Sequence, residues 1–297
     1  MKQNTVVLAG ATGDLGERIA RALVSKGARV QAIVRPGTSA QVRQRLTAQG
    51  MTVMESGYDA ASLVRLCQGA DCLVSALNGL EDAILGQQGA LLDAAVAAGV
   101  PRFIPSDFSL DYTRTTPGEN RNMDLRRTFR GRLDAAPIRA SSVLNGAFST
   151  VLTDDAPIML PKARRVLYWG DVDQTLNFTT KDDVAEFTAD AALDDDAPRD
   201  LRIAGGSSSP RELAAIATAM SDKTYRPMRA GGFTRLGALI RVTQMLAPAK
   251  GAVFPAWQGM QYLRDMMSGR GELSALDNGR YGKTDWTDIQ TMISRLV

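Results

Sequence analysis

The apolar and polar positions near the start of the chain alternate in blocks of the kind that build a βαβ unit. Residues 5–9 form a short apolar run rich in β-branched side chains, which predicts a strand buried on both faces. Three glycines follow within residues 10–16, and residues 17–26 then carry apolar side chains at helical spacing and end at Gly27. Residues 28–34 form a second apolar run. The pattern predicts strand, turn, helix and strand in sequence.

The same alternation continues to about residue 144 and predicts a parallel sheet with helices on both faces. The further predicted helices are 39–49, 60–68, 81–98 and 118–135, and the further predicted strands are 51–55, 71–76, 102–105 and 138–144. We therefore expect an α/β fold with a Rossmann-type doubly wound parallel sheet. Right-handed crossovers bring the carboxyl ends of all its strands to one edge, where ligands bind.

The rhythm changes after about residue 150. The pattern predicts two short strands within 162–179, a helix at 180–192 and a strand at 200–204. It then predicts a helix that opens at Ser209 and further helices near 233–246, 254–268 and 285–296. We expect an NAD(P)-binding Rossmann domain at 1–155 and a smaller, mostly helical substrate lobe at 156–297. Part of residues 160–205 could belong to the sheet of the first domain. We expect the active cleft between the two domains.

The amino-acid composition limits the possible catalytic chemistry mainly because the chain has no histidine. The 297 residues include no histidine, which excludes a histidine-based triad, metal site or general base. Cys67 and Cys72 are too few for a zinc site or a disulfide framework, so we expect two buried side chains and no metal. The net charge of +3 is too small to argue for nucleic acid, and no apolar run is long enough to cross a membrane. Because no apolar leader precedes the first strand, we expect a cytoplasmic protein.

The strongest motif is the glycine-rich turn after the first strand, which carries glycines in a G-x-x-G-x-x-G spacing. Gly10 allows the tight turn out of the strand, Gly13 lets the backbone approach a diphosphate, and Gly16 lets the helix pack close to the sheet. The helix N-terminus adds free amide groups and a partial positive charge for phosphates. We therefore expect the loop to bind a dinucleotide, with Thr12, Asp14 and Leu15 also at the cofactor.

The residue after the second strand indicates which dinucleotide binds. NAD-binding proteins place Asp or Glu there to bind the ribose hydroxyls, whereas this chain has Arg35, whose forked donors suit a 2′-phosphate. NADP(H) is therefore the expected cofactor. Arg43 could add a second cation, although a solvated helix position explains it better. The small residues Ser75 and Ala76, with Leu77, follow the fourth strand and either let the cofactor lie across the sheet edge or form a simple strand-to-helix turn.

A segment in the middle of the chain carries a distinctive set of residues: Gln88, Leu91-Leu92-Asp93-Ala94-Ala95, the run from Gly99 to Phe108 that contains Pro105-Ser106-Asp107-Phe108, and Asp111. Together with the Gly-Ala-Thr-Gly opening, these residues resemble the NmrA-like and isoflavone-reductase-like group of atypical short-chain dehydrogenases/reductases. It implies a Rossmann fold, NADP(H) with Ser106 and Phe108 at the cofactor, and a small substrate lobe. It also implies either reduction of small aromatic molecules or an NAD(P)-sensing regulator without turnover.

The sequence departs from this family at the proton-handling position. Family reductases carry a Lys on the helix after the Pro-Ser-acidic-Phe stretch, and an ungapped alignment places Arg126 there. An arginine stabilises negative charge but is a poor acid or base. Tyr112 is not followed by the Lys of a Tyr-x-x-x-Lys pair, because Thr116 stands four residues later. We retain Arg126 and Tyr112 as the catalytic candidates, with Tyr112 either a proton donor or a tyrosine that packs in the core.

Two further groups of residues each allow two interpretations. Asn145 and Phe148 match the family's substrate-facing stretch or are packing residues. Arginines crowd the segment before them, either on a solvated helix face or as a basic rim for an acidic or phenolic substrate: Arg114, Arg121, Arg126, Arg127, Arg130, Arg132 and Arg139. Methionines and aromatic side chains recur in the C-terminal helices, where a lobe core is favoured over a pocket for a flat ligand: Met245, Phe254, Trp257, Met260, Tyr262, Met266 and Met267.

Three functions remain after these observations. The favoured one is an NADPH-dependent reductase that transfers a hydride to a small aromatic substrate, with charge stabilised by Arg126. The alternative is a non-catalytic NADP(H)-sensing regulator that binds a partner protein, which the missing Lys and His favour. An epimerase or dehydratase with tightly held NAD fits less well with Arg35 and the lack of a base. The expected partners are a small aromatic molecule and, as an assembly to test, a second copy in a homodimer, with neither nucleic acid nor membrane.

Overall fold

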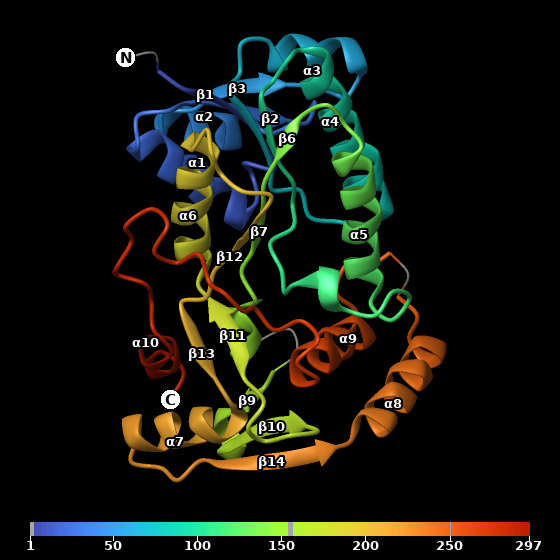
Figure 1. The fold of residues 1–297 in the computed structure, drawn as a ribbon, viewed down its shortest axis with the longest axis vertical. Helices are drawn as coiled ribbons and strands as arrows, with labels where there is room; N and C mark the ends of the chain where they lie inside the picture. The colour runs from blue at the N-terminus through green and yellow to red at the C-terminus, as the bar shows by residue number, and fades with distance from the viewer. Residues whose placement is uncertain (1–2, 154–156, 250) are drawn as a thin grey trace. The chain divides into compact units, whose positions relative to one another are not determined.

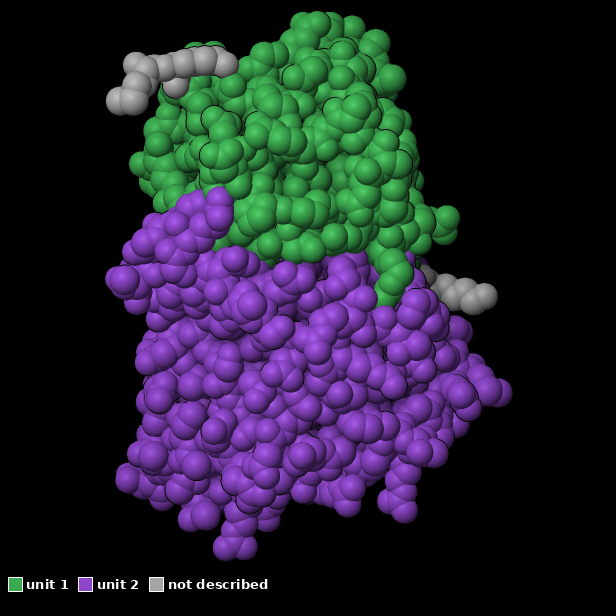
Figure 2. All heavy atoms as spheres, viewed as in Figure 1, with its two compact units in different colours: residues 1–108, 125–143, 181–201 green, residues 109–124, 144–180, 202–297 purple. Residues whose placement is uncertain are grey.

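A computed structural model describes residues 3–153, 157–249 and 251–297, and these residues divide into two compact units. Unit 1 comprises residues 1–108, 125–143 and 181–201, and unit 2 comprises residues 109–124, 144–180 and 202–297 (Figure 2). The chain thus leaves and re-enters each unit, whereas the sequence predicted one boundary near residue 155. The segment that returns to unit 1 lies at 181–201, within the range singled out for a return to the sheet.

Unit 1 is built on a six-stranded sheet in the order β3-β2-β1-β4-β5-β6. Every neighbouring pair in it is parallel. The strands are β1 (Thr5–Ala9), β2 (Arg29–Val34), β3 (Thr52–Glu55), β4 (Cys72–Ser75), β5 (Arg102–Ile104) and β6 (Arg139–Ala140). The order reverses between β1 and β4, which is the switch point at which doubly wound sheets bind dinucleotides. The predicted Rossmann-type parallel sheet is therefore confirmed.

Helices cover both faces of this sheet (Figure 1). They are α1 (Asp14–Ser25), α2 (Ala40–Ala48), α3 (Ala60–Cys67), the π-helix η1 (Asp82–Gln87), α4 (Gln88–Ala97), α5 (Arg121–Asp134, in unit 1 from Leu125) and α6 (Lys181–Leu193). α6 packs along α1 on one face. On the other face, Phe129 of α5 packs against Phe103 of the sheet with the two rings tilted and 6.1 Å between their centroids.

The predicted strand 138–144 is two strands, because serines redirect the chain between them. β6 joins the main sheet, and β7 (Ser142–Leu144) pairs with β12 (Asp200–Arg202) instead. The amide of Ser141 donates to the Phe103 carbonyl, whereas the amide of Ser142 donates to the Arg199 carbonyl. The Ser142 hydroxyl also donates to Asp107 Oδ2 at 2.7 Å. Both serine side chains are buried and form hydrogen bonds. The hydrophobic pattern of residues 138–144 therefore could not show where one strand ends and the next begins.

Unit 2 combines small sheets with helices. Its strands are β8 (Ala147–Phe148), β9 (Met159–Leu160), β10 (Arg165–Trp169), β11 (Leu176–Thr179), β13 (Gly206–Ser208) and β14 (Arg226–Gly231). Its α-helices are α7 (Pro210–Met220), α8 (Phe233–Leu246), α9 (Ala256–Met267) and α10 (Ile289–Ser294), with short 3₁₀ turns η2 (Tyr112–Arg114), η3 (Ser149–Leu152) and η4 (Pro161–Ala163). The strands form two sheets, β14-β10-β9 and β13-β11-β8. The predicted helices α7 to α10 are confirmed within a few residues, whereas β14 was not predicted.

Local capping explains where several helices begin. In α7 the Ser209 side chain accepts from the Glu212 amide, and the Glu212 carboxylate accepts from the Ser209 amide at 2.8 Å. This is the capping box that the sequence predicted.

Both cysteines are buried, and burial raises the pKa of the Cys67 thiol to about 11 and that of Cys72 to about 12. Along the described part of the chain, no helix is both long and apolar enough to cross a membrane.

A buried polar cluster in unit 2 links α9 to the residues that precede α5. Asp265 is fully buried, and its Oδ2 accepts from Asn120 Nδ2 at 2.7 Å. The Asn120 Oδ1 in turn accepts from Gln258 Nε2 at 2.7 Å. The other Asp265 oxygen has no hydrogen-bond partner among the described residues, and Arg264 Nε lies 3.9 Å from it. Burial therefore raises the pKa of this carboxyl group.

This cluster generates a prediction about stability and pH. The pKa of Asp265 is higher in the folded chain than its ordinary value of 3.8, so folding favours the neutral acid, and ionisation costs stability as the pH rises past that value. Asp265→Asn keeps the shape without the charge. We expect this variant to be more stable than the parent near pH 7, by about 1 kcal/mol in urea unfolding. The gap should close in acid, and Asp222→Asn on an exposed carboxylate is the control. A less stable Asp265→Asn variant at neutral pH would contradict it.

Candidate functional site

The glycine-rich turn between β1 and α1 brings three backbone segments into close approach. Gly10 has φ of +88°, and a Cβ atom there would lie 2.5 Å from the Ala76 carbonyl oxygen. A Cβ at Gly16 would lie 2.1 Å from the Gly10 carbonyl oxygen. Neither distance is sterically allowed, so both positions require glycine. The first turn of α1 is therefore held against the ends of β1 and β4, as expected for Gly10 and Gly16.

Gly13 has a different role, because the space beside it is open. A Cβ there would meet only the Gly10 carbonyl oxygen, at 3.4 Å. Gly13 is the N-cap of α1 and supplies no side chain to its first amides. Thr12 and Asp14 beside it are exposed, and Leu15 is half-buried. These unscreened amides and the open backbone fit the diphosphate of a dinucleotide.

The ends of β4 and β5 complete the same edge of the sheet. The Ala76 amide donates to the Ala9 carbonyl at 2.8 Å, which sets residues 75–77 beside the glycine turn. Ser106 is fixed twice: its hydroxyl donates to the Leu77 carbonyl at 2.6 Å, and its amide donates to Gln88 Oε1 at 2.9 Å. Phe108 follows and is buried. Unit 1 therefore brings together the predicted cofactor residues Ser75, Ala76, Leu77 and Ser106.

Gln88 was quoted only for the family resemblance, and the structure gives it a local reason. The side chain is fully buried on α4, directly after the π-helix η1, and its Nε2 has no hydrogen-bond partner among the described residues. The Ser75 hydroxyl is likewise buried without one. The wide turn of a π-helix often occurs at functional sites. The 3.6-residue periodicity of 81–98 predicted an ordinary helix there.

The cationic candidates after β2 differ in what surrounds them. Arg35 is exposed directly after the strand and lies near Tyr58, whose pKa is raised by burial and lowered in part by the Arg35 charge. Arg43 instead forms an ion pair with Glu55, with 2.9 Å between Nη1 and Oε2. Arg43 is therefore engaged on a solvated surface, which was the favoured interpretation. Tyr58, which sequence reasoning missed, has a positive φ of 67° in the loop after β3.

The Asp14 carboxylate sits in the first turn of α1, where a cofactor phosphate would repel it. Two cations offset this charge, because Lys181 Nζ lies 2.7 Å and Arg18 Nε 2.8 Å from its oxygens. Hydrogen bonds from Lys181 and then Arg18 lower the pKa of Asp14. Arg18 also pairs with Asp182 on α6. The side chain of Asp14 is therefore engaged with α1 and α6, and its backbone amide is the group that could face a phosphate.

The two catalytic candidates lie in different units. Arg126 is on the part of α5 that belongs to unit 1, and it is only 8% exposed. Tyr112 begins η2 in unit 2, is fully buried, and belongs to the hydrophobic core of that unit. A tyrosine in this core is the packing alternative considered for it. The contribution of either residue to catalysis stays a prediction.

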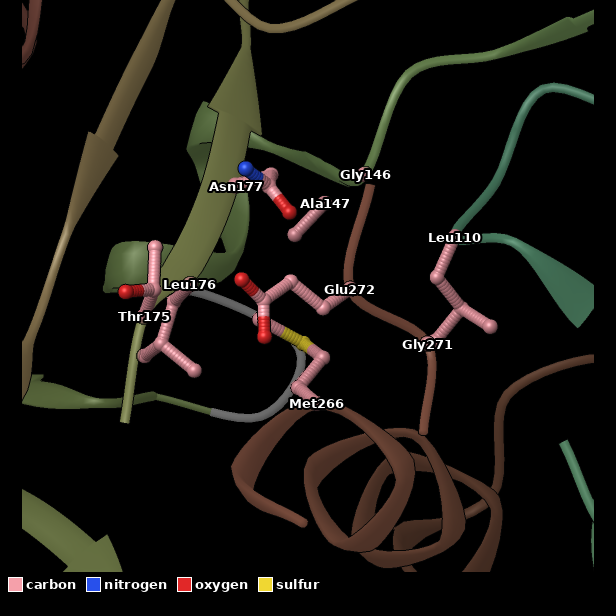
Figure 3. A pocket seen from close by; sticks show the side chains of 9 residues that line it. All are labelled: Leu110, Gly146, Ala147, Thr175, Leu176, Asn177, Met266, Gly271 and Glu272. Carbon is pink, nitrogen blue, oxygen red and sulfur yellow. The ribbon is translucent and has the colours of Figure 1, made fainter. Parts of the chain in front are cut away.

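Unit 2 contains a hollow beside the predicted substrate residues (Figure 3). It lies between β11, the end of α9 and the segment from Gly146 to Ala147, and its volume of about 10 Å³ has room for about one water molecule. Asn145 precedes that segment and is fully buried, with its amide donating to the Ser109 carbonyl at 2.9 Å. Phe148 follows it and is half-buried. Neither side chain lines the hollow, whereas Glu272 and Asn177, which sequence reasoning missed, do.

Most of the clustered arginines hold loops and neighbouring elements. Arg130 pairs with Asp200, Arg132 with Asp93, and Arg139 donates to the Asp195 carbonyl. Arg114 donates to the Glu272 carbonyl, and Arg121 lies over the Trp257 ring, 4.5 Å from its centroid. Five of the seven are therefore structural contacts.

The methionine and aromatic side chains of the C-terminal helices divide between core and surface. Trp257, Met266 and Met267 are buried, whereas Met245 and Phe254 are 81% and 47% exposed. Met266 also lines the hollow. The favoured interpretation as a lobe core holds for the buried members.

Comparisons with known proteins agree on one group. The model of the NmrA-like family matches residues 2–232. The chain is 28% identical to pinoresinol reductase 1 of Arabidopsis thaliana over 215 residues, covering 67% of each chain. It is 29% identical to the isoflavone reductase homolog IRL of Zea mays over 241 residues, covering 76% of this chain and 77% of that one. The solved structure of AtPrR2 with NADP+ and (+)pinoresinol superposes with a TM-score of 0.84 at 21% identity over the whole of both chains.

The two kinds of glycine in the turn give separable predictions. Gly16→Ala places a methyl group against the Gly10 carbonyl, so we expect a loss of about 2 kcal/mol or more in unfolding free energy. Gly13→Ala has room for its methyl group and should fold normally, but the methyl group would occupy the diphosphate position. We expect it to weaken NADPH binding at least about 10-fold, measured by titration of NADPH fluorescence. Unchanged NADPH affinity in a folded Gly13→Ala variant would refute the assigned position.

Proposed function

The chain belongs to the NmrA-like family, and on this basis we propose that it is an NADPH-dependent reductase of small aromatic substrates. The observation that carries the proposal is the open backbone at Gly13, set at the N-terminus of α1 where the strand order reverses. Arg35 at the end of β2 supplies the charge that distinguishes NADPH from NADH. Relatives named as pinoresinol reductase and isoflavone reductase homolog support an aromatic substrate.

The residues of the chain would orient the reactants rather than carry the redox chemistry. Bound NADPH supplies the hydride. The turn at residues 10–16 holds the diphosphate, and the doubly anchored Ser106 fixes the sheet edge beside Leu77. Arg126, a buried cation on α5, would stabilise negative charge that develops on the substrate. Since arginine is a poor acid, the proton would come from water or from Tyr112.

The cofactor preference can be tested at Arg35. Removal of the guanidinium takes away a charge-assisted contact to the 2′-phosphate, which NADH lacks. We expect Arg35→Ala to raise the Kd for NADPH about 10- to 100-fold while the Kd for NADH changes little. Arg43→Ala is the matched control, because that side chain is engaged with Glu55 and should alter neither value strongly. An equal loss of affinity for NADPH and NADH in Arg35→Ala would contradict the assignment of Arg35 to the 2′-phosphate.

Turnover itself is tested by NADPH oxidation with a panel of aromatic ketones, enones and benzylic ethers. We expect at least one substrate to be reduced by the parent protein. Arg126→Met should lower kcat about 100-fold, whereas Arg126→Lys retains the charge and should keep or raise activity. NADPH affinity, measured separately, should change little in both variants. If no panel member is reduced while NADPH binds tightly, the chain is an NADP(H)-sensing regulator instead.

A further inference from the structure

A glutamine in unit 1 occupies a position that its surroundings suit to an apolar residue. The buried side of α4 carries Leu91, Leu92 and Ala95, which belong to the hydrophobic core of the unit. Gln88 lies one helical turn before the two leucines, so it shares that side of the helix. Its side chain is fully buried. A buried polar side chain in a row of apolar ones needs a specific partner.

The partner of this side chain is the backbone of Ser106, which follows β5. Gln88 Oε1 accepts from the Ser106 amide at 2.9 Å. The bond fixes which way the side-chain amide points, because only its oxygen can accept from a backbone amide. The Ser106 hydroxyl donates to the Leu77 carbonyl at 2.6 Å. Residue 106 is therefore held from α4 through its amide and from the end of β4 through its hydroxyl.

The nitrogen of the Gln88 amide brings no comparable benefit. Nε2 has no hydrogen-bond partner among the described residues, and a buried donor without a partner lowers stability. The π-helix η1 ends directly before this residue, and such wide turns are frequent at functional sites. A core position that breaks local rules at a cost in stability is expected where the residue serves function. The bond to Ser106 is the one that Gln88 makes among the described side chains and backbone.

The place of Ser106 in the sheet indicates which part of the cofactor this bond affects. A doubly wound sheet is built from two mononucleotide-binding halves, one on each side of the switch point. In the order β3-β2-β1-β4-β5-β6, Arg35 follows β2 in one half and Ser106 follows β5 in the other. With the 2′-phosphate expected at Arg35, the adenosine part of NADP(H) belongs to the first half. The nicotinamide part then belongs to the half that contains Ser106.

We propose that Gln88 is a positioning residue for the nicotinamide part of NADP(H), and that it acts by fixing the backbone of Ser106. The adenosine part is bound without its help. This inference rests on the proposed function for its cofactor, but it can be measured without turnover. Because the Gln88 side chain is buried, it acts through Ser106 and not by contact with the cofactor.

Two ligands separate the two parts of the site in isothermal titration calorimetry. NADPH is the whole cofactor, and adenosine 2′,5′-bisphosphate lacks the nicotinamide nucleotide. Gln88→Met fills similar space without an acceptor for the Ser106 amide. We expect it to raise the Kd for NADPH at least about 5-fold and to leave the Kd for the bisphosphate within about 2-fold. Gln87→Met is the matched control, because Gln87 is half-buried and donates to Asp82 Oδ2 at 2.9 Å, and it should change neither value.

A second variant tests the same position from its other anchor. Ser106→Ala removes the hydroxyl bond to Leu77 and keeps the amide bond to Gln88. It should also weaken NADPH selectively, and the losses in Ser106→Ala and Gln88→Met should not add in the double variant, because both act on residue 106. If Gln88→Met does not fold, Ser106→Ala alone decides. Equal losses for both ligands, an unchanged NADPH affinity in a folded variant, or strictly additive losses would each overturn the inference.

The outcomes separate this inference from the proposed function. If NADPH affinity depends selectively on Gln88 while no aromatic substrate is reduced, the positioning role stands and the reductase assignment fails. If reduction occurs but the loss in Gln88→Met is not selective, the reductase stands and the role of Gln88 is wrong. With a reducible substrate, kcat at saturating NADPH should fall at least about 5-fold in Gln88→Met while the KM for that substrate changes little, because hydride transfer depends on where the nicotinamide lies.

Discussion

The contact on which unit 1 depends is the approach of the Gly10 carbonyl to the backbone of Gly16, where even a single methyl group has no room. This approach fixes how α1 leaves β1, and therefore where the first amides of the helix point. The neighbouring strand β4 is tied to the same turn through the Ala76 amide. One steric constraint thus sets both the start of the helix and the adjoining sheet edge, which is where doubly wound folds bind phosphates.

The fold of unit 1 could be predicted from the sequence because the patterns that indicate it lie within short stretches of chain. Strands β1 and β4 are fully buried, mainly apolar runs, and several of the helices between the strands have regular apolar spacing and glycine or capping residues at their ends. The cofactor turn is defined within seven residues by steric rules that hold in any protein. The expectation for Arg35 is equally local, because it rests only on the place of this residue after a strand end, and its role at the cofactor stays a prediction.

The residues of unit 2 were harder to predict because their roles come from contacts between distant segments. Glu272 accepts a hydrogen bond from Gln174, 98 positions earlier in the chain, and no local pattern marks either residue. Strand β14 contains a proline and mostly exposed side chains, so it shows no alternation and is held by pairing with β10. The break between β6 and β7 depends on buried serines whose partners lie on other elements. Only a three-dimensional structure supplies such pairings.

The discontinuous course of the chain has a consequence for how such a protein can be divided. Unit 1 contains α6, which packs along α1, yet α6 begins at Lys181, far along the chain from the other segments of that unit, 1–108 and 125–143. A fragment that ends before α6 would expose the apolar side of α1 to water. A fragment that extends through α6 would also contain an incomplete part of unit 2. Neither unit is encoded by one continuous stretch of sequence, so a single crossover between two related genes cannot exchange one unit whole.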